Sequence, residues 1–126
     1  MNTIITSHGY HPDDWDSGNV LTLQGDCNHD AALKDAQSYQ KIIINFSSNS
    51  DGRGFSLARH LRERGFKGCL RAQGALVPDQ WRHLMSTGFN DLSLTQDQII
   101  KMPLESWAEV QGLVLPDYRE KLFGDG

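Results

Sequence analysis

The sequence predicts a single α/β domain with a three-layer arrangement, in which helices cover both faces of an open, mostly parallel sheet. The strongest observation is a β-branched apolar run at residues 41–46, which has the composition of a strand buried on both faces. Two more apolar runs follow, and a segment with helical periodicity separates each run from the next. This alternation with short connections is typical of parallel strands joined by right-handed crossovers.

Length and composition agree with this class. The chain has 126 residues, enough for one domain over residues 1–126, and its 38% hydrophobic content is sufficient for a core. The same βαβαβ core also fits a fragment of a barrel. We expect the open sheet, because about five strands are too few to close an eight-stranded parallel barrel.

The amino-terminal part has the weakest pattern. Residues 1–18 are polar and contain Pro12 and Gly18, so we expect an irregular arm. Residues 20–23 then predict a short strand. Residues 30–39 predict a short helix, because their apolar side chains repeat at near-helical spacing.

The motif-bearing core spans residues 40–95. We expect strands at residues 41–46, 68–72 and 89–94, and helices at residues 54–64 and 78–87. Gly65 and Gly88 stand just past the two helices, where glycine commonly ends a helix. One or two short helices at residues 96–101 and 104–110 follow, before a tail at residues 111–126.

The charge distribution narrows the class of partner. The net charge of −4 argues against general nucleic-acid binding, because phosphate neutralisation needs a surplus of Lys and Arg. Residues 51–82 nevertheless carry seven basic and three acidic side chains between two acidic flanks. This basic centre fits a small anion or an acidic partner, and it equally fits a solvated helix face balanced by the flanks.

Cysteine and apolar content indicate a cytoplasmic protein. Cys27 and Cys69 are far apart in the chain and form no disulfide framework. The first residues lack the basic and apolar regions of a signal peptide, and the densest apolar run is too short to cross a bilayer. His8, His11, Cys27 and His29 have metal-binding atoms, but their spacing is loose, so we expect no metal site.

The loop after the strand at residues 41–46 is the first candidate site, because ligands of open α/β sheets bind beyond the carboxyl ends of the strands. The candidate binding residues there are Asp51, Gly52, Arg53, Gly54 and Ser56. Free backbone N–H groups and the dipole of the following helix favour an anion. The structural alternative is that Asp51 caps the helix or pairs with an arginine, and that the glycines only allow a tight turn.

The loop after the next strand supplies the second group of candidates, which are Arg71, Gly74, Asp79 and Gln80. Arg71 is suited to bidentate contact with a carboxylate, a sulfur oxyanion or a phosphate. Its structural alternative is a buried ion pair with Asp51 or Asp79. The glycine spacing matches neither a full dinucleotide fingerprint nor a P-loop, and no catalytic residue is identified.

The stretch DGRGFSLARHLRERGFKGCLRAQG at residues 51–74, followed by Asp79-Gln80 and Gly88-Phe89, resembles a bacterial family, the domain of unknown function 934 family. Its members are often labelled as oxidoreductases involved in sulfite reduction, from gene neighbourhood with the sulfite reductase haemoprotein. The resemblance implies an accessory role in assimilatory sulfur metabolism, with that haemoprotein as a partner. Residues 75–78 depart from the family pattern, which has a more polar, arginine-containing run there.

Three hypotheses for function follow. The first is an accessory protein of sulfite reduction that binds an oxyanion or a partner at the loops of residues 51–56 and 71–80. The second is an oxidoreductase that borrows a flavin or nicotinamide nucleotide, although no redox centre is evident and the cofactor is unknown. The third is a non-enzymatic interaction or assembly module, with exposed aromatics such as Trp15 or Trp107 at the partner surface.

Overall fold

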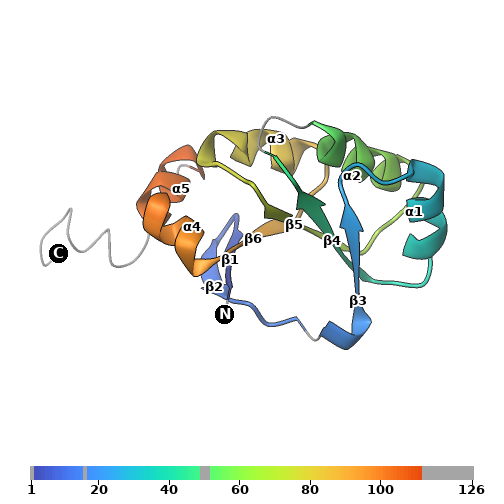
Figure 1. The fold of residues 1–126 in the computed structure, drawn as a ribbon, viewed down its shortest axis with the longest axis horizontal. Helices are drawn as coiled ribbons and strands as arrows, with labels where there is room; N and C mark the ends of the chain where they lie inside the picture. The colour runs from blue at the N-terminus through green and yellow to red at the C-terminus, as the bar shows by residue number, and fades with distance from the viewer. Residues whose placement is uncertain (1, 16, 49–51, 112–126) are drawn as a thin grey trace, which may run out of the picture.

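The sheet in the computed structural model, which describes residues 2–15, 17–48 and 52–111, has six strands in the order β2-β1-β6-β5-β4-β3 (Figure 1). Its parallel part consists of β3 (Val20–Gln24), β4 (Lys41–Phe46), β5 (Cys69–Gly74) and β6 (Asp91–Leu94). The predicted α/β class with an open, mostly parallel sheet is confirmed.

The helices also follow the predicted alternation. They are α1 (His29–Ala36), α2 (Arg53–Glu63), α3 (Trp81–Ser86), α4 (Gln96–Lys101) and α5 (Leu104–Gln111), with short 3-10 helices η1 (Ser17–Asn19) and η2 (Pro78–Gln80). Side-chain hydrogen bonds cap the amino-terminal ends of two of these helices. Asn28 accepts the Ala31 N–H at 2.9 Å before α1, and Thr95 accepts the Gln98 N–H at 3.2 Å before α4. Of the predicted tail at residues 111–126, Gln111 belongs to α5, and residues 112–126 lie outside the described residues.

One face of the sheet carries the core. Ile44, Ala72 and Leu92 are register neighbours on β4, β5 and β6, and all three are fully buried. Alternate residues of a strand point to opposite faces, so these side chains share one face. Helices α1, α2 and α3 lie along that face in Figure 1.

Residues 13–15 and 17–19 lie between β2 at one edge of the sheet and β3 at the other, on the side of the opposite face. The Trp15 ring of this segment lies over the guanidinium of Arg71, 3.7 Å from the ring centroid. The second face is therefore covered at Arg71, whereas Thr22, Gln24 and Cys69 on the same face are exposed.

The prediction of an irregular arm at residues 1–18 is wrong, because a β-hairpin occupies most of it. Strand β1 (Thr3–Thr6) pairs antiparallel with β2 (Gly9–Pro12) on one side and with β6 on the other. Burial of Ile4 and Ile5 at 0% and 2% exposure holds β1 in the sheet. A partner about ninety residues away thus determines this strand, and no local pattern shows it.

The parallel strands are wound in one direction. β3, β4, β5 and β6 are neighbours in both sequence and space, so each crossover moves one position along the sheet in the same sense. The strand order within β3 to β6 does not reverse, and so these four strands contain no topological switch point. The carboxyl ends of β3 to β6 lie side by side at one end of the strands, which we call the carboxyl edge of the sheet. Strand β1 begins at this carboxyl edge because it runs antiparallel to β6.

Candidate functional site

A cavity of about 440 Å³ opens at the carboxyl ends of the parallel strands. We call it the carboxyl-edge cavity, and its lining residues are Asn2, Asn45, Gln73, Gly74, Ala75, Ser93, Thr95 and Gln98. Six of these eight side chains are amides or hydroxyls, and none carries a charge. They come from the ends of β4, β5 and β6, from α4, and from the residue preceding β1.

Strand register places the amides in a row. Gln24, Asn45 and Gln73 are Cα partners across β3, β4 and β5, so their side chains point to the same face, away from α1 to α3. The Asn45 amide Nδ2 donates to Gln24 Oε1 at 3.0 Å. Asn2 reaches the same edge from the start of β1, where its Nδ2 donates to Ser93 Oγ at 2.9 Å.

Gly74 shapes the cavity through its backbone. Its φ of +102° is unfavourable for residues with a side chain, and a Cβ there would lie 2.3 Å from the Phe46 carbonyl oxygen. The close approach lets the next residue, Ala75, donate its N–H to that carbonyl at 2.8 Å. The Gly74 carbonyl in turn accepts from Gln98 Nε2, which joins the end of β5 to α4. Of the predicted binding residues that the structure describes, Gly74 lines this cavity.

Arg71 lies in the middle of the sheet rather than at its carboxyl edge. Its Nε and Nη2 donate to the two carboxylate oxygens of Asp91 at 2.8 and 3.1 Å, and its Nη1 donates to Asp13 at 3.2 Å. The side chain is 1% exposed and stacks beneath Trp15. A buried ion pair was one of the two predicted roles. The predicted partner Asp79 is wrong, and the other predicted partner, Asp51, lies outside the described residues. Asp91 is the partner because it is the register neighbour of Arg71 on β6.

The start of α2 contains the other glycine-rich candidates. Asp51 lies outside the described residues. Gly52 precedes the helix, and Arg53 and Ser56 are exposed on its first turn. Gly54 has a packing role, because a Cβ there would lie 2.5 Å from the Phe46 ring. Its lack of a side chain lets α2 approach β4 closely.

Asp79 and Gln80 belong to η2, between β5 and α3. Asp79 is exposed, and the Gln80 side-chain oxygen accepts the Val77 N–H at 3.0 Å. Gln80 thus satisfies a backbone donor at the start of this short helix. The structure does not bring these two residues to the carboxyl-edge cavity.

Sequence reasoning did not select the amide and hydroxyl residues of the cavity. The sequence does contain an indication for Asn45 and Gln73 as site residues, since each is an amide near the carboxyl end of an apolar strand and the two strands are consecutive. Asn2 and Ser93 had none, because their proximity depends on the pairing of β1 with β6.

The predicted partner-surface aromatics are not free on the surface. Trp107 is 1% exposed within the core, and its indole N–H has no acceptor among the described residues. Trp15 is half-buried over Arg71. Neither ring therefore offers the exposed patch that the interaction hypothesis expected.

The four residues with metal-binding atoms, which are His8, His11, Cys27 and His29, are not brought together by the structure. In residues 2–15, 17–48 and 52–111, no three His, Cys, Asp or Glu side chains form a group that could hold a metal ion. His11 on β2 and the pair Cys27 and His29 after β3 lie at opposite edges of the sheet. Burial raises the pKa of the Cys27 thiol, which keeps it protonated and poorly nucleophilic.

None of the described helices has the length and apolar character needed to cross a membrane.

Comparison with known proteins agrees with the motif resemblance. A family model described as a bacterial protein of unknown function, DUF934, matches residues 20–120. The chain belongs to the DUF934 family. A search of curated proteins and a search of solved structures each found no match. The DUF934 match runs from β3 through α5, so it includes every strand of the parallel part of the sheet and leaves the β1–β2 hairpin outside.

Proposed function

We propose that this protein is an accessory protein of assimilatory sulfite reduction that binds a small sulfur oxyanion, sulfite or sulfate, in the carboxyl-edge cavity. The single observation that carries the binding proposal is the neutral, donor-rich lining of that cavity. The link to sulfite reduction rests on the resemblance to the DUF934 family and the label that its members carry. The proposal assigns binding and no catalytic step.

The lining of the carboxyl-edge cavity has hydrogen-bond donors that the described residues do not use. A side-chain amide has two N–H donors, and Asn2 and Asn45 each use one of theirs within the cavity wall. Ser93 Oγ accepts from Asn2, which leaves its own O–H to donate. Gln73 makes no side-chain hydrogen bond to the described residues, so its whole amide is available. These groups suit the acceptor oxygens of an oxyanion.

The electrostatics of this edge also favour an anion. Helices that return between parallel strands run opposite to them, so the amino-terminal ends of α1, α2 and α3 lie toward the carboxyl edge. Each amino-terminal end carries a partial positive charge. No acidic side chain lines the carboxyl-edge cavity. Helix α2 has no acidic residue in its first turn, whereas α1 has Asp30 there.

Ligand-dependent stabilisation tests the binding proposal. Melting is followed with sulfite, sulfate, phosphate and chloride at matched ionic strength. At about 100 times Kd, a ligand stabilises the native state by about 2.7 kcal/mol. For a domain of 126 residues this raises Tm by about 10 °C. Gln73→Leu should abolish the rise with sulfite, whereas Gln37→Leu, an exposed glutamine at the end of α1, should retain it.

Two results would reject the proposal separately. If no oxyanion raises Tm in the wild-type protein, or if Gln73→Leu responds like Gln37→Leu, the cavity is not an oxyanion site. The accessory role has its own assay, the rate of purified sulfite reductase haemoprotein with and without this protein at saturating sulfite. An unchanged rate together with no complex in analytical ultracentrifugation would reject that role whatever the cavity binds.

A further inference from the structure

We propose that a second site, at the opposite edge of the sheet, docks a partner segment that presents one apolar side chain flanked by carboxylates. The site is a groove of about 340 Å³ between the carboxyl-terminal ends of α1 and α2 and the loop at residues 64–68. We call it the amino-edge groove, because Gln40 and Gly68 in its wall precede β4 and β5. It shares no lining residue with the carboxyl-edge cavity.

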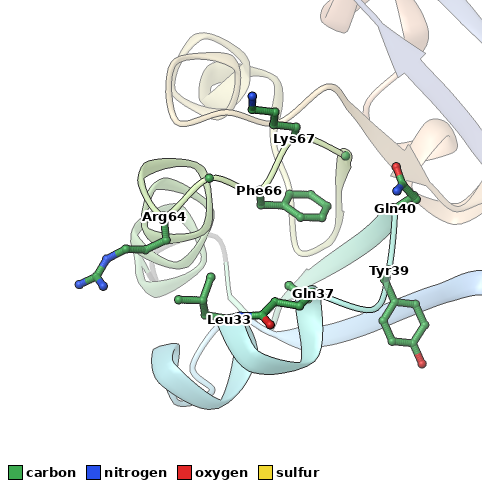
Figure 2. Close-up of a pocket in the computed structure, with 10 residues that line it drawn as sticks. Leu33, Gln37, Tyr39, Gln40, Arg64, Phe66 and Lys67 are labelled. Carbon is green, nitrogen blue, oxygen red and sulfur yellow. The ribbon is translucent and has the colours of Figure 1, made fainter.

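The floor of the groove is apolar and half-open. Leu33, Tyr39 and Phe66 pack against the core but each stays partly exposed, and Ala36 is buried between them and the core. Figure 2 shows Leu33 and Gln37 on α1 below the ring of Phe66. A further apolar side chain placed here would cover surface that the fold leaves open to water.

The wall formed by residues 64–68 is held in place by Arg62. Its Nη1 donates to the Phe66 and Gly68 carbonyls at 3.1 and 2.7 Å, and its Nε donates to the Gly88 carbonyl at 2.9 Å. A Cβ on Gly68 would lie 2.2 Å from the Gln40 carbonyl oxygen, so glycine is needed where the loop closes on the chain before β4. The groove is therefore preformed, which lowers the ordering cost of binding.

The rim of the groove is positively charged. Arg64 and Lys67 line it and extend outward from the loop in Figure 2, and no acidic residue lines it. Both cations belong to the basic centre of an otherwise acidic chain. Charge complementarity therefore selects a partner with carboxylates beside the apolar group.

The sequence motif agrees with this position. The segment Arg64-Gly65-Phe66-Lys67-Gly68 is part of the stretch that resembles the family, and it takes no part in the carboxyl-edge cavity. Both its apolar ring and its cations face or border the groove. The volume is close to that of one or two side chains, so we infer a short peptide segment rather than a helix as the occupant.

Fluorescence anisotropy with a labelled peptide tests the proposal. The probe is a fluorescein-labelled Glu-Asp-Phe-Asp-Glu amide, and the matched probes replace its four acids with lysine or its Phe with Ser. Each replacement should weaken binding at least tenfold. Lys67→Glu, alone or combined with Arg64→Glu, should weaken binding of the acidic probe at least tenfold. Arg59→Glu, an exposed charge reversal on α2 outside the groove, should leave it within twofold.

The outcomes are separable from those at the other site. Gln73→Leu should bind the acidic probe like the wild-type protein, so failure of the oxyanion proposal does not affect this assay. Equal weakening by Arg59→Glu and by Lys67→Glu would overturn the docking proposal, as would no binding at millimolar peptide. Light scattering that shows a dimer lost on Lys67→Glu would also overturn it, since the occupant would then be a second copy of this chain.

Discussion

Replacing Arg71 with methionine tests whether this residue stabilises the fold or binds a ligand. Methionine retains an unbranched side chain beneath Trp15 but removes the charge. Arg71 is 1% exposed and bidentate to Asp91, whose side chain is 13% exposed. Removing one partner of a buried ion pair leaves an uncompensated charge and costs about 3–5 kcal/mol.

This cost converts to a large thermal shift. The unfolding entropy of a 126-residue domain is about 0.26 kcal/mol/K, so Arg71→Met should lower Tm by about 10–20 °C. Urea unfolding followed by circular dichroism measures the free energy directly. The chain has three tryptophans, so the local signal of Trp15 is obtained as the difference from a Trp15→Phe variant; its ring centroid lies 3.7 Å from the guanidinium carbon.

The matched control removes both charges of the Arg71–Asp91 pair. The other carboxylates near Arg71, those of Asp13 and Asp14, are 32% and 67% exposed and stay in contact with solvent. Arg71→Met combined with Asp91→Leu should recover most of the lost stability, because replacing both partners of a buried pair with apolar groups is often neutral. A loss below about 1 kcal/mol in the single variant would refute the reasoning, since a buried unpaired carboxylate costs more than that. A double variant no more stable than the single one would refute it equally.

Two further predictions concern Gly74 and the cysteines. Gly74→Ala should lower the free energy of unfolding by about 1–3 kcal/mol, because its φ is +102° and a Cβ would meet the Phe46 carbonyl. Urea unfolding measures this, and Gly52→Ala, where a Cβ meets no atom within 4 Å, should cost far less. Exposed Cys69 should react with a disulfide reagent at pH 8 well before half-buried Cys27, whose pKa is raised by burial. Cys69→Ser should remove the fast phase, and a fast phase that persists would contradict the assignment.

Local sequence pattern accounts for the parallel part of the fold. The apolar run at residues 41–46 and the helical spacing that follows it are both satisfied within a few residues of chain, so periodicity was enough to find β4 and α2. The hairpin at residues 3–12 was missed because β1 depends on β6 for its second set of hydrogen bonds. Polar composition there indicates solvent contact on β2, not the absence of a strand.

The same division applies to the sites. One of the two predicted roles of Arg71 is a buried ion pair, because an arginine inside an apolar strand needs a counter-charge. Its partner depends on strand register, which the sequence does not display. The general rule for parallel strands points to the carboxyl ends of the strands, and the carboxyl-edge cavity with Gly74 lies at that end of the sheet. Neutral amides at strand ends are also common on solvated surfaces, so the sequence alone does not single out Asn45 and Gln73 as site residues.

The pairing of β1 with β6 affects how the chain folds. Asn2 directly precedes β1, and Ser93 lies in β6, 91 positions further along the chain. The two strands are nevertheless direct neighbours in the sheet. Contacts so distant in sequence slow folding, because a long loop must close before they form. During synthesis the hairpin emerges before β6, and β1 has no second neighbouring strand until β6 has left the ribosome. The β3 to β6 layer therefore forms before its last edge is covered, and the buried Ile4 and Ile5 remain open to wrong partners until then.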